Sequence, residues 1–199
     1  MIRHAAPLLA LAVALAAPAA SAQTRPPEGP RPGPEAPRTP ASTLDDLFTR
    51  LADSKDEDEA NGIAALIQRR FARSGSDTAD LLMERAGTAL KAQDAALAVE
   101  LLDRVTQLKP DWAEAWSRRA AAFHGLDDPG QAMQDLQRAL AREPRHFTAW
   151  VALGHLEFAS GDKRRALLAY RQALRIHPHL GAVKGIVDRL APDIEGRDL

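Results

Sequence analysis

The sequence has no cysteine, few aromatic residues and no excess of either charge. The absence of Cys among the 199 residues excludes disulfides, thiolate metal sites and cysteine nucleophiles. Lysine and arginine number 26 against 27 aspartates and glutamates, so the formal net charge is −1. Proteins that bind nucleic acid normally carry a basic excess, which is missing here. Aromatic residues make up only 5%, and the abundance of Ala, Leu, Arg, Glu and Gln favours helix over sheet.

Motifs with a known chemistry are also missing. The sequence contains no Gly-rich phosphate loop, nucleophile elbow, H-E-x-x-H pair or EF-hand loop. His177 and His179 flank Pro178 and could ligate a metal, but no third ligand is near them in sequence, and a solvated turn is the better interpretation. The acidic run from Asp53 to Glu59 lacks calcium-loop spacing and fits the start of a helix. We therefore expect neither enzymatic activity nor a metal or cofactor.

The first 22 residues have the features of an export signal. A short positive region at Arg3 is followed by an apolar run and by Ala20-Ser21-Ala22, the small-x-small pattern of a cleavage site. We expect cleavage after Ala22, which predicts a bacterial periplasmic or secreted protein with no membrane span after cleavage. The alternative is an uncleaved N-terminal anchor helix, although the apolar run is short for a membrane span.

Residues 23–41 contain seven of the 14 prolines. Such a stretch lacks the backbone donors and the apolar residues that a folded segment needs. It predicts an extended linker, and a docking motif for a partner is the alternative.

One pattern recurs along the rest of the chain every 34 residues. Prolines at 110, 144 and 178, alanines at 98, 132 and 166, and tryptophans at 116 and 150 share this spacing. A second small-residue series and a series of Leu or Tyr keep the same register. The repeat positions with an expected structural role are Trp116, Ala132, Ala139, Pro144, Trp150, Gly154, Ala166, Tyr170, Ala173 and Pro178.

This pattern resembles the tetratricopeptide repeat, with its signature W-x2-L-G-x2-Y, then A-x3-F, then P. The best copy runs from Trp150 to Pro178 and departs from the signature at Glu157, which takes an aromatic position. The copy before it has Arg119 where Leu is usual. The resemblance implies an all-α fold, in which antiparallel helix pairs stack into a right-handed superhelix with capping helices.

The individual positions support this interpretation on physical grounds. Small residues allow helices to cross closely, whereas Trp116, Trp150 and Tyr170 fill the space between pairs. Each repeat-ending proline stops a helix, and Asp128 and Asp162 are good N-caps. These signals predict helices near 77–91, 95–108, 111–125, 129–141, 145–160, 163–176 and 179–190.

The predicted organisation has three clear repeats and less regular flanks. The repeats span residues 77–110, 111–144 and 145–178. A helix within 179–191 is expected to cover the apolar end of the stack, and 192–199 form a tail. Residues 42–76 predict a helical hairpin, which we interpret as a degenerate repeat that caps the N-terminal end. A hairpin that packs elsewhere is the alternative.

The function most consistent with these features is a protein-interaction scaffold of the cell envelope. The resemblance implies a peptide or partner protein bound on the concave face, which the first helices of the repeats line. An oligomerisation or assembly module that acts through its terminal helices is the alternative. An enzyme is disfavoured because no acid, base or nucleophile constellation is present.

The expected partner-binding positions follow from the same resemblance, and the sequence does not name the partner. Arg118 is the expected polar anchor, and its alternative role is an i,i+4 pair with Glu114. The Lys and Asn positions of relatives that clamp a chaperone's C-terminal carboxylate are not matched here. The full predicted set is Met83, Gly87, Leu90, Glu114, Ser117, Arg118, Ala121, His124, Thr148, Val151, His155 and Phe158.

Overall fold

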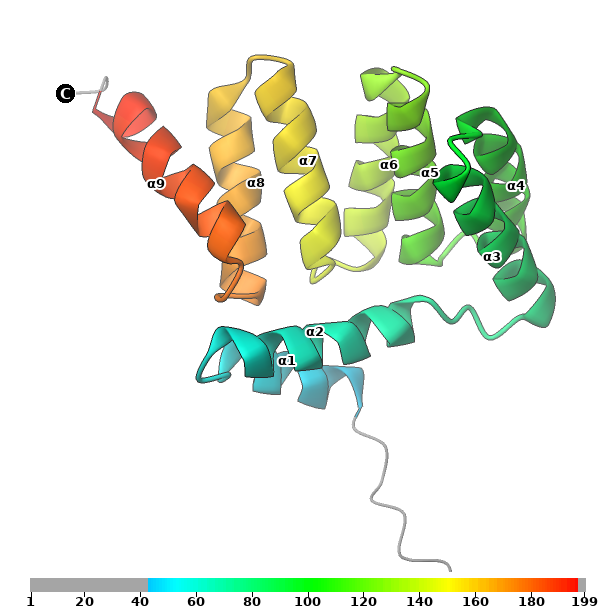
Figure 1. Ribbon diagram of the computed structural model, residues 1–199, viewed down its shortest axis with the longest axis horizontal. Helices are drawn as coiled ribbons and strands as arrows, with labels where there is room; N and C mark the ends of the chain where they lie inside the picture. The colour runs from blue at the N-terminus through cyan, green and yellow to red at the C-terminus, as the bar shows by residue number, and fades with distance from the viewer. Residues whose placement is uncertain (1–42, 197–199) are drawn as a thin grey trace, which may run out of the picture. The chain divides into compact units, whose positions relative to one another are not determined.

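The helices begin where the sequence provides side-chain caps. Asp94, Asp128 and Asp162 each accept the backbone N–H three residues later, at 2.9–3.0 Å, which satisfies a donor that the first helical turn leaves unpaired. The computed structural model describes residues 43–196, which form nine helices and no strand (Figure 1). The predicted all-α class is confirmed. The predicted signal segment (1–22) and linker (23–41) lie outside the described residues.

The observed helix bounds agree closely with the predicted ones over the three clear repeats. The helices are α1 (Leu44–Ala52), α2 (Glu57–Phe71), α3 (Asp77–Lys91), α4 (Ala95–Leu108), α5 (Ala113–Gly125), α6 (Pro129–Arg142), α7 (Phe147–Ala159), α8 (Lys163–Ile176) and α9 (Gly181–Glu195). The pairs α3–α4, α5–α6 and α7–α8 pack together and stack in chain order, and α9 packs on α8. Among the described residues, no helix is long and apolar enough to cross a membrane.

The small residues of the 34-residue pattern lie where helices cross. Ala132, Ala139, Ala166 and Ala173 are fully buried, so a larger side chain would have no room there. Gly154 is needed for the same reason, because a Cβ at this position would lie only 2.6 Å from Cε1 of Tyr170. The predicted close contact between the first and second helix of this repeat is therefore confirmed.

The two repeat tryptophans make the same contact one period apart. Nε1 of Trp116 donates to the carbonyl of Pro110, and Nε1 of Trp150 donates to the carbonyl of Pro144, both at 2.8 Å. Each tryptophan thus ties a first helix to the turn that precedes it. The spacing of Trp and Pro in the sequence reflects this hydrogen bond.

Arg119, which takes a usual leucine position, forms an ion-pair cluster between three helices. Its guanidinium contacts Asp103 of α4 at 2.7 Å and Asp135 of α6 at 2.7 Å, and it lies 4.7 Å from the ring centroid of Trp116. Asp135 is fully buried and also accepts from Arg138. The hydrogen bond that Arg119 donates to Asp135 raises the pKa of Arg119 above its ordinary value, although burial opposes this shift. A polar bridge therefore replaces the expected apolar contact.

The C-terminal helix is longer than predicted. We expected a tail from residue 192, but α9 continues to Glu195 with Pro192 inside it. Ile194 packs on the apolar cluster between α8 and α9, and Glu195 accepts a hydrogen bond from Arg171 at 2.6 Å. These contacts with α8 extend the helix beyond a residue that normally ends one.

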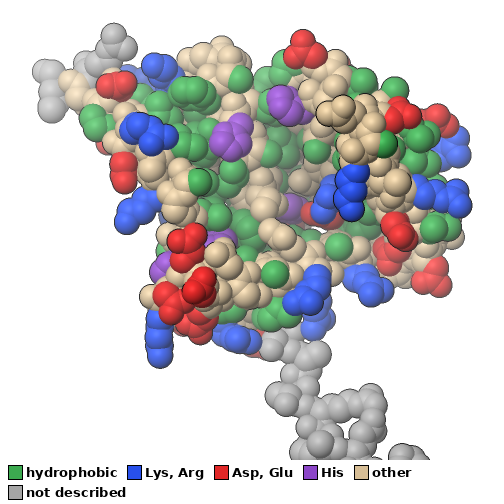
Figure 2. Space-filling model, viewed as in Figure 1, with side chains coloured by type: hydrophobic (Ala, Val, Ile, Leu, Met, Phe, Trp, Pro, Cys, Tyr) green, Lys and Arg blue, Asp and Glu red, His purple; other side chains and the backbone are tan. Residues whose placement is uncertain are grey.

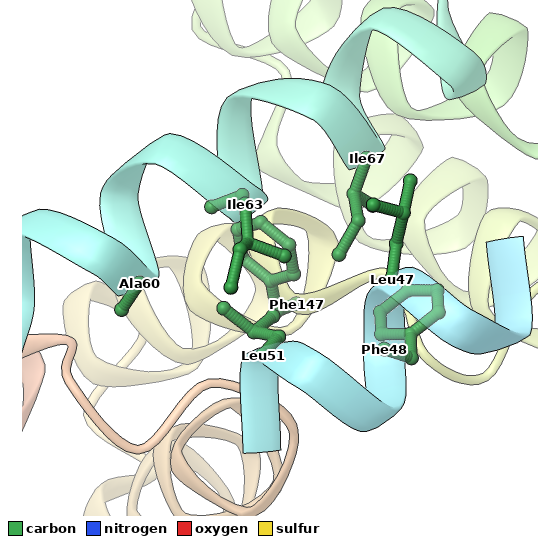
Figure 3. Packing of buried hydrophobic residues seen from close by; sticks show 8 residues of the cluster. Leu47, Phe48, Leu51, Ala60, Ile63, Ile67 and Phe147 are labelled. Carbon is green, nitrogen blue, oxygen red and sulfur yellow. The ribbon is translucent and has the colours of Figure 1, made fainter. Parts of the chain in front are cut away.

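The hairpin α1–α2 does not continue the stack in front of α3. It lies across the ends of the later helix pairs (Figure 1). Its apolar face packs around Phe147 of α7, with Ile176 and Leu180 beside it (Figure 3). The preferred interpretation as a capping repeat is therefore wrong, and the alternative, a hairpin that packs elsewhere, is what the structure shows.

The turns between repeats form the platform on which this hairpin lies. Nε1 of Trp112 donates to the carbonyl of Phe71 at 2.7 Å, and Nε2 of His179 lies 2.9 Å from the carbonyl of Ser54. Arg145 contacts Asp45 at 2.6 Å, and its guanidinium lies 4.4 Å from the ring centroid of Phe48. Three successive turns thus contact the hairpin through the residues that follow the prolines.

The outer face of α3 explains why no repeat precedes it. Leu153 and Leu156 of α7 are buried against the preceding pair. Two periods earlier in sequence, the equivalent places in α3 hold the polar residues Arg85 and Thr88, and both are exposed. A polar outer face is what the end of a repeat stack requires, so α3 itself forms that end.

Candidate functional site

A groove crosses the first helices of the second and third repeats. It has a volume of about 610 Å³. On the face seen in Figure 2, histidines and a few charged side chains interrupt the hydrophobic surface between the helices. The lining residues are Gln68, Glu114, Ser117, Arg118, Ala120, Ala121, His124, Leu136, Thr148, Ala152, His155, Leu156 and Ala159.

Part of the predicted binding set meets in this groove. Seven predicted residues line it: Glu114, Ser117, Arg118, Ala121, His124, Thr148 and His155. The others lie elsewhere. Met83 and Leu90 pack against the α3–α4 core, Val151 packs with α8 and α9, and Phe158 is exposed outside the groove. Gly87 is not among the lining residues either. Whether any of them binds a partner stays a prediction.

Two predicted residues of α7, Val151 and Phe158, do not line the groove, and the helix phase gives the reason. The α7 residues that line the groove follow the i, i+4, i+7, i+11 spacing of one helix face: Thr148, Ala152, His155 and Ala159. Val151 lies one residue before Ala152, and this step turns a side chain by about 100° away from the face. The spacing of small residues at 152 and 159 was the signal for the correct face.

Glu114 connects the groove to the turn before α7. Its side chain is nearly buried, its Oε1 accepts from Nε of Arg118 at 2.6 Å, and its Oε2 lies 2.9 Å from Nε2 of His146. The alternative role for Arg118, an i,i+4 pair with Glu114, is therefore present in the structure. Half of the Arg118 side chain remains exposed at 51%, so this pair also faces the groove.

His146 caps the N-terminus of α7, and this contact determines which ring nitrogen carries the proton. The backbone N–H of Ala149 donates to Nδ1 at 3.3 Å, so Nε2 carries the proton of the neutral ring and donates it to Glu114. The ring stacks on Phe71 of α2, with 4.7 Å between centroids. Burial raises the pKa of the Glu114 carboxyl, but the hydrogen bond from His146 and the charge of Arg118 outweigh it and lower that pKa. Glu114 is therefore an ionised carboxylate in the groove wall.

The remaining polar lining consists of imidazole, hydroxyl and amide side chains. Nδ1 of His155 lies 2.8 Å from the hydroxyl of Tyr170, which fixes the orientation of its ring. His124 and Ser117 come from α5, and Gln68 comes from α2 of the hairpin. Gln68 was not among the predicted residues, because nothing in the 34-residue pattern placed the hairpin at the groove.

The histidines around Pro178 serve the packing of the hairpin. His177 is 1% exposed and lies edge-on to Phe147 at 5.2 Å, and His179 contacts Ser54. Within residues 43–196, no group of three or more His, Asp or Glu side chains is arranged to hold a metal ion. The acidic run from Asp53 to Glu59 forms the α1–α2 turn and the start of α2, where Asp56 caps the helix.

Comparison with known proteins agrees with the helix pairing. Residues 147–179 match the family model described as "Tetratricopeptide repeat". A TPR repeat-containing protein of Rhizobium etli is 34% identical over 158 residues, which cover 79% of this chain and 78% of that protein. The chain belongs to the tetratricopeptide repeat family.

More distant relatives share the fold over part of the chain. The small glutamine-rich tetratricopeptide repeat-containing protein 2 of Saccharomyces cerevisiae is 28% identical over 128 residues, and the match covers 64% of this chain and 37% of the yeast protein. The first TPR of Spaghetti (RPAP3), solved with the HSP90 peptide SRMEEVD, superposes with a TM-score of 0.57 at 19% identity, over 60% of this chain and 95% of that one. MamA superposes with a TM-score of 0.51 at 21% identity, over 74% of this chain and 86% of that one. These structures show the fold.

Proposed function

We propose that this chain is a non-catalytic scaffold that binds a peptide or a partner protein in the groove between α5 and α7. The observation that carries this proposal is the groove itself, which is lined by small and apolar residues together with polar ones. Ala120, Ala121, Ala152 and Ala159 leave space that bulky side chains of a partner would fill.

The likeness to peptide-binding proteins supports the proposal. One similar structure is the RPAP3 domain with the HSP90 peptide, and another is the TPR2B domain of yeast Sti1 in a complex with pHsp70. Those chains hold their partners on the same architecture. The catalytic motifs sought in the sequence are absent, which also favours a binding role.

We also propose that the protein is exported and acts in the bacterial cell envelope or outside the cell. The support for this is the segment Met1–Ala22, with its apolar run and its Ala-Ser-Ala end. The test is the N-terminal sequence of the protein recovered from the periplasm and the medium. A chain that begins at Gln23 supports export, whereas a full-length chain confined to the cytoplasm contradicts it.

The groove is tested by site-specific photo-crosslinking in the native host. A photo-reactive amino acid at Thr148, in the groove lining, is expected to capture a discrete partner. The same amino acid at Gln137, an exposed position on α6 outside the groove lining, serves as the matched control. Equal capture at both positions would contradict a binding role for the groove.

A second variant tests whether partner capture requires an unfilled groove. Ala121→Trp places a bulky ring in the groove at an exposed position, so it is expected to abolish capture at Thr148 without unfolding the protein. Gln137→Trp adds the same ring outside the groove and should leave capture unchanged. Circular dichroism of both variants is the control for correct folding.

A further inference from the structure

The wall of the groove contains a carboxylate that is held in place from two sides. Glu114 is 8% exposed, its pKa is lowered, and it holds Arg118 at 2.6 Å through Nε. Nε2 of His146 lies 2.9 Å from the other carboxylate oxygen, and Nδ1 of the same ring accepts the backbone N–H of Ala149. A carboxylate held in this way from two sides cannot turn out of the groove.

This arrangement cancels the one full positive charge among the lining residues. The charged side chains that line the groove are Arg118 and Glu114, and they form a pair with no net charge. The lining histidines are His124 and His155, and His155 is already engaged by Tyr170. An incoming carboxylate would therefore meet Arg118 with Glu114 directly behind it.

We infer that Glu114 is a specificity-determining residue of the groove. It disfavours acidic peptide ends, so the groove accepts a segment of a partner protein that is apolar and has no carboxylates. The inference rests on the proposed function, because it takes the groove as the binding surface. Repulsion from Glu114 offsets the attraction of a ligand carboxylate to Arg118, so the carboxylate would lose hydration in the groove without a net favourable charge interaction. The apolar lining residues then supply the favourable contacts.

The test uses the acidic peptide SRMEEVD, which the similar RPAP3 domain binds. Fluorescence anisotropy of the labelled peptide measures its affinity for the full chain and for Glu114→Gln. Glutamine keeps the shape and can accept one hydrogen bond while it removes the negative charge. We expect Glu114→Gln to bind the peptide at least about tenfold more tightly than the unsubstituted chain, a difference of about 1.4 kcal/mol. Addition of Arg118→Gln to this variant is expected to remove the gain.

A matched control exists on α4. Glu100 and Arg104 form another i,i+4 pair at 2.6 Å, outside the groove lining and largely exposed. Glu100→Gln changes the net charge by the same amount, and it is expected to leave the affinity for the peptide unchanged. An equal gain in both variants would mean that net charge alone is responsible, and this outcome overturns the inference.

A measurement on the unsubstituted chain does not depend on how the variant folds. The same peptide with its carboxylates replaced by amides should bind at least about tenfold more tightly than the acidic form. Equal or tighter binding of the acidic form overturns the inference, as does a folded Glu114→Gln chain with unchanged affinity. Failure of crosslinking at Thr148 would count against the proposed function, whereas failure of the peptide comparison counts against the role of Glu114.

Discussion

The repeat stack and the α1–α2 hairpin are both built from amphipathic helix pairs, but they are held in place in different ways. In the stack each pair packs on its sequence neighbours, through contacts that recur with the 34-residue period, such as those of Trp116 and Trp150. The hairpin is held by residues that are distant in sequence, including Arg145 and His179. A periodic sequence therefore specifies the stack locally, whereas the position of the hairpin depends on a surface that exists only after the repeats have stacked.

The same difference applies to the ion pairs of the two regions. In the stack, Asp135 is fully buried beneath Arg119. On the hairpin, Asp45 is 83% exposed and its partner Arg145 is 39% exposed. Desolvation makes the first pair strongly coupled, while solvent screens the second. The following four predictions address this contrast, from the largest expected effect to the smallest.

Asp135→Ala should be the most damaging change. It removes the buried partner of Arg119 and leaves a cation that is only 13% exposed without its main counter-charge. We expect a loss of about 3–5 kcal/mol in the free energy of unfolding, measured by urea denaturation. Glu100→Gln, in an exposed pair, is the control and should change the value by less than about 1 kcal/mol. Similar effects of both changes would show that the buried cluster does not stabilise the stack.

Ala166→Leu should be the next most damaging. Ala166 is fully buried in the cluster between α8 and α9, so the larger side chain overpacks the crossing. The expected cost is about 1–3 kcal/mol, seen as a lower Tm. Leucine at Lys163, an exposed position three residues earlier, is the matched control. An unchanged Tm for Ala166→Leu would show that the assigned crossing is wrong.

The docking of the hairpin should weaken in mild acid. Burial lowers the pKa of His177, and its Nδ1 is buried without a hydrogen-bond partner among the described residues. His179 lowers that pKa further, and Glu57 opposes the shift. Because the pKa of His177 in the folded protein lies below its ordinary value of 6.5, the stabilisation is fully present above pH 6.5 and is lost as the pH falls through the folded pKa.

Hydrogen exchange of α1 and α2 at pH 7.5 and 5.5, corrected for the intrinsic rates, measures this effect. We expect protection of both helices to fall at the lower pH relative to that of α5–α8. His177→Leu cannot be protonated and should reduce this difference. The same loss of protection in the variant would assign the pH dependence to other groups.

Asp45→Asn should have the smallest effect. It removes the charge that Arg145 contacts, but both side chains are substantially exposed and Arg145 keeps Glu143 as a partner at 3.0 Å. The expected change is about 0–1 kcal/mol in the free energy of unfolding, and it should become smaller at high salt. A larger change would mean that this ion pair holds the hairpin more strongly than its exposure indicates.

Much of the candidate site followed from helix phase once the repeats had been aligned. Arg118 and His155 were expected on the concave face, and both line the groove. Val151 and Phe158 were misplaced, because a helix face is defined only to within one residue when neighbouring side chains are both apolar. The contact between Glu114 and His146 was not predicted, because the two residues are 32 positions apart and His146 lies in a turn that appeared to be only a connection.

The sequence also contains a signal for the position of the hairpin. The turns next to the repeat-ending prolines contain large apolar residues, namely Trp112, Phe147 and Leu180. Solvated turns have no need of such side chains, and here they contact or pack against the hairpin. The polar residues Arg85 and Thr88 on α3 were a second signal, because they leave little apolar surface for a preceding repeat.

The sequence by itself determined the helices, their pairing and the order of the stack. Proline, tryptophan and alanine recur every 34 residues because each repeat makes the same contacts with its neighbour. Contacts that recur in this way produce a periodic sequence. Only the tertiary structure decided where the hairpin lies and that Gln68 reaches the groove. It alone also paired Glu114 with both Arg118 and His146. Those contacts occur only once, between residues that come together only after the repeats have stacked. They therefore produce no periodic pattern in the sequence.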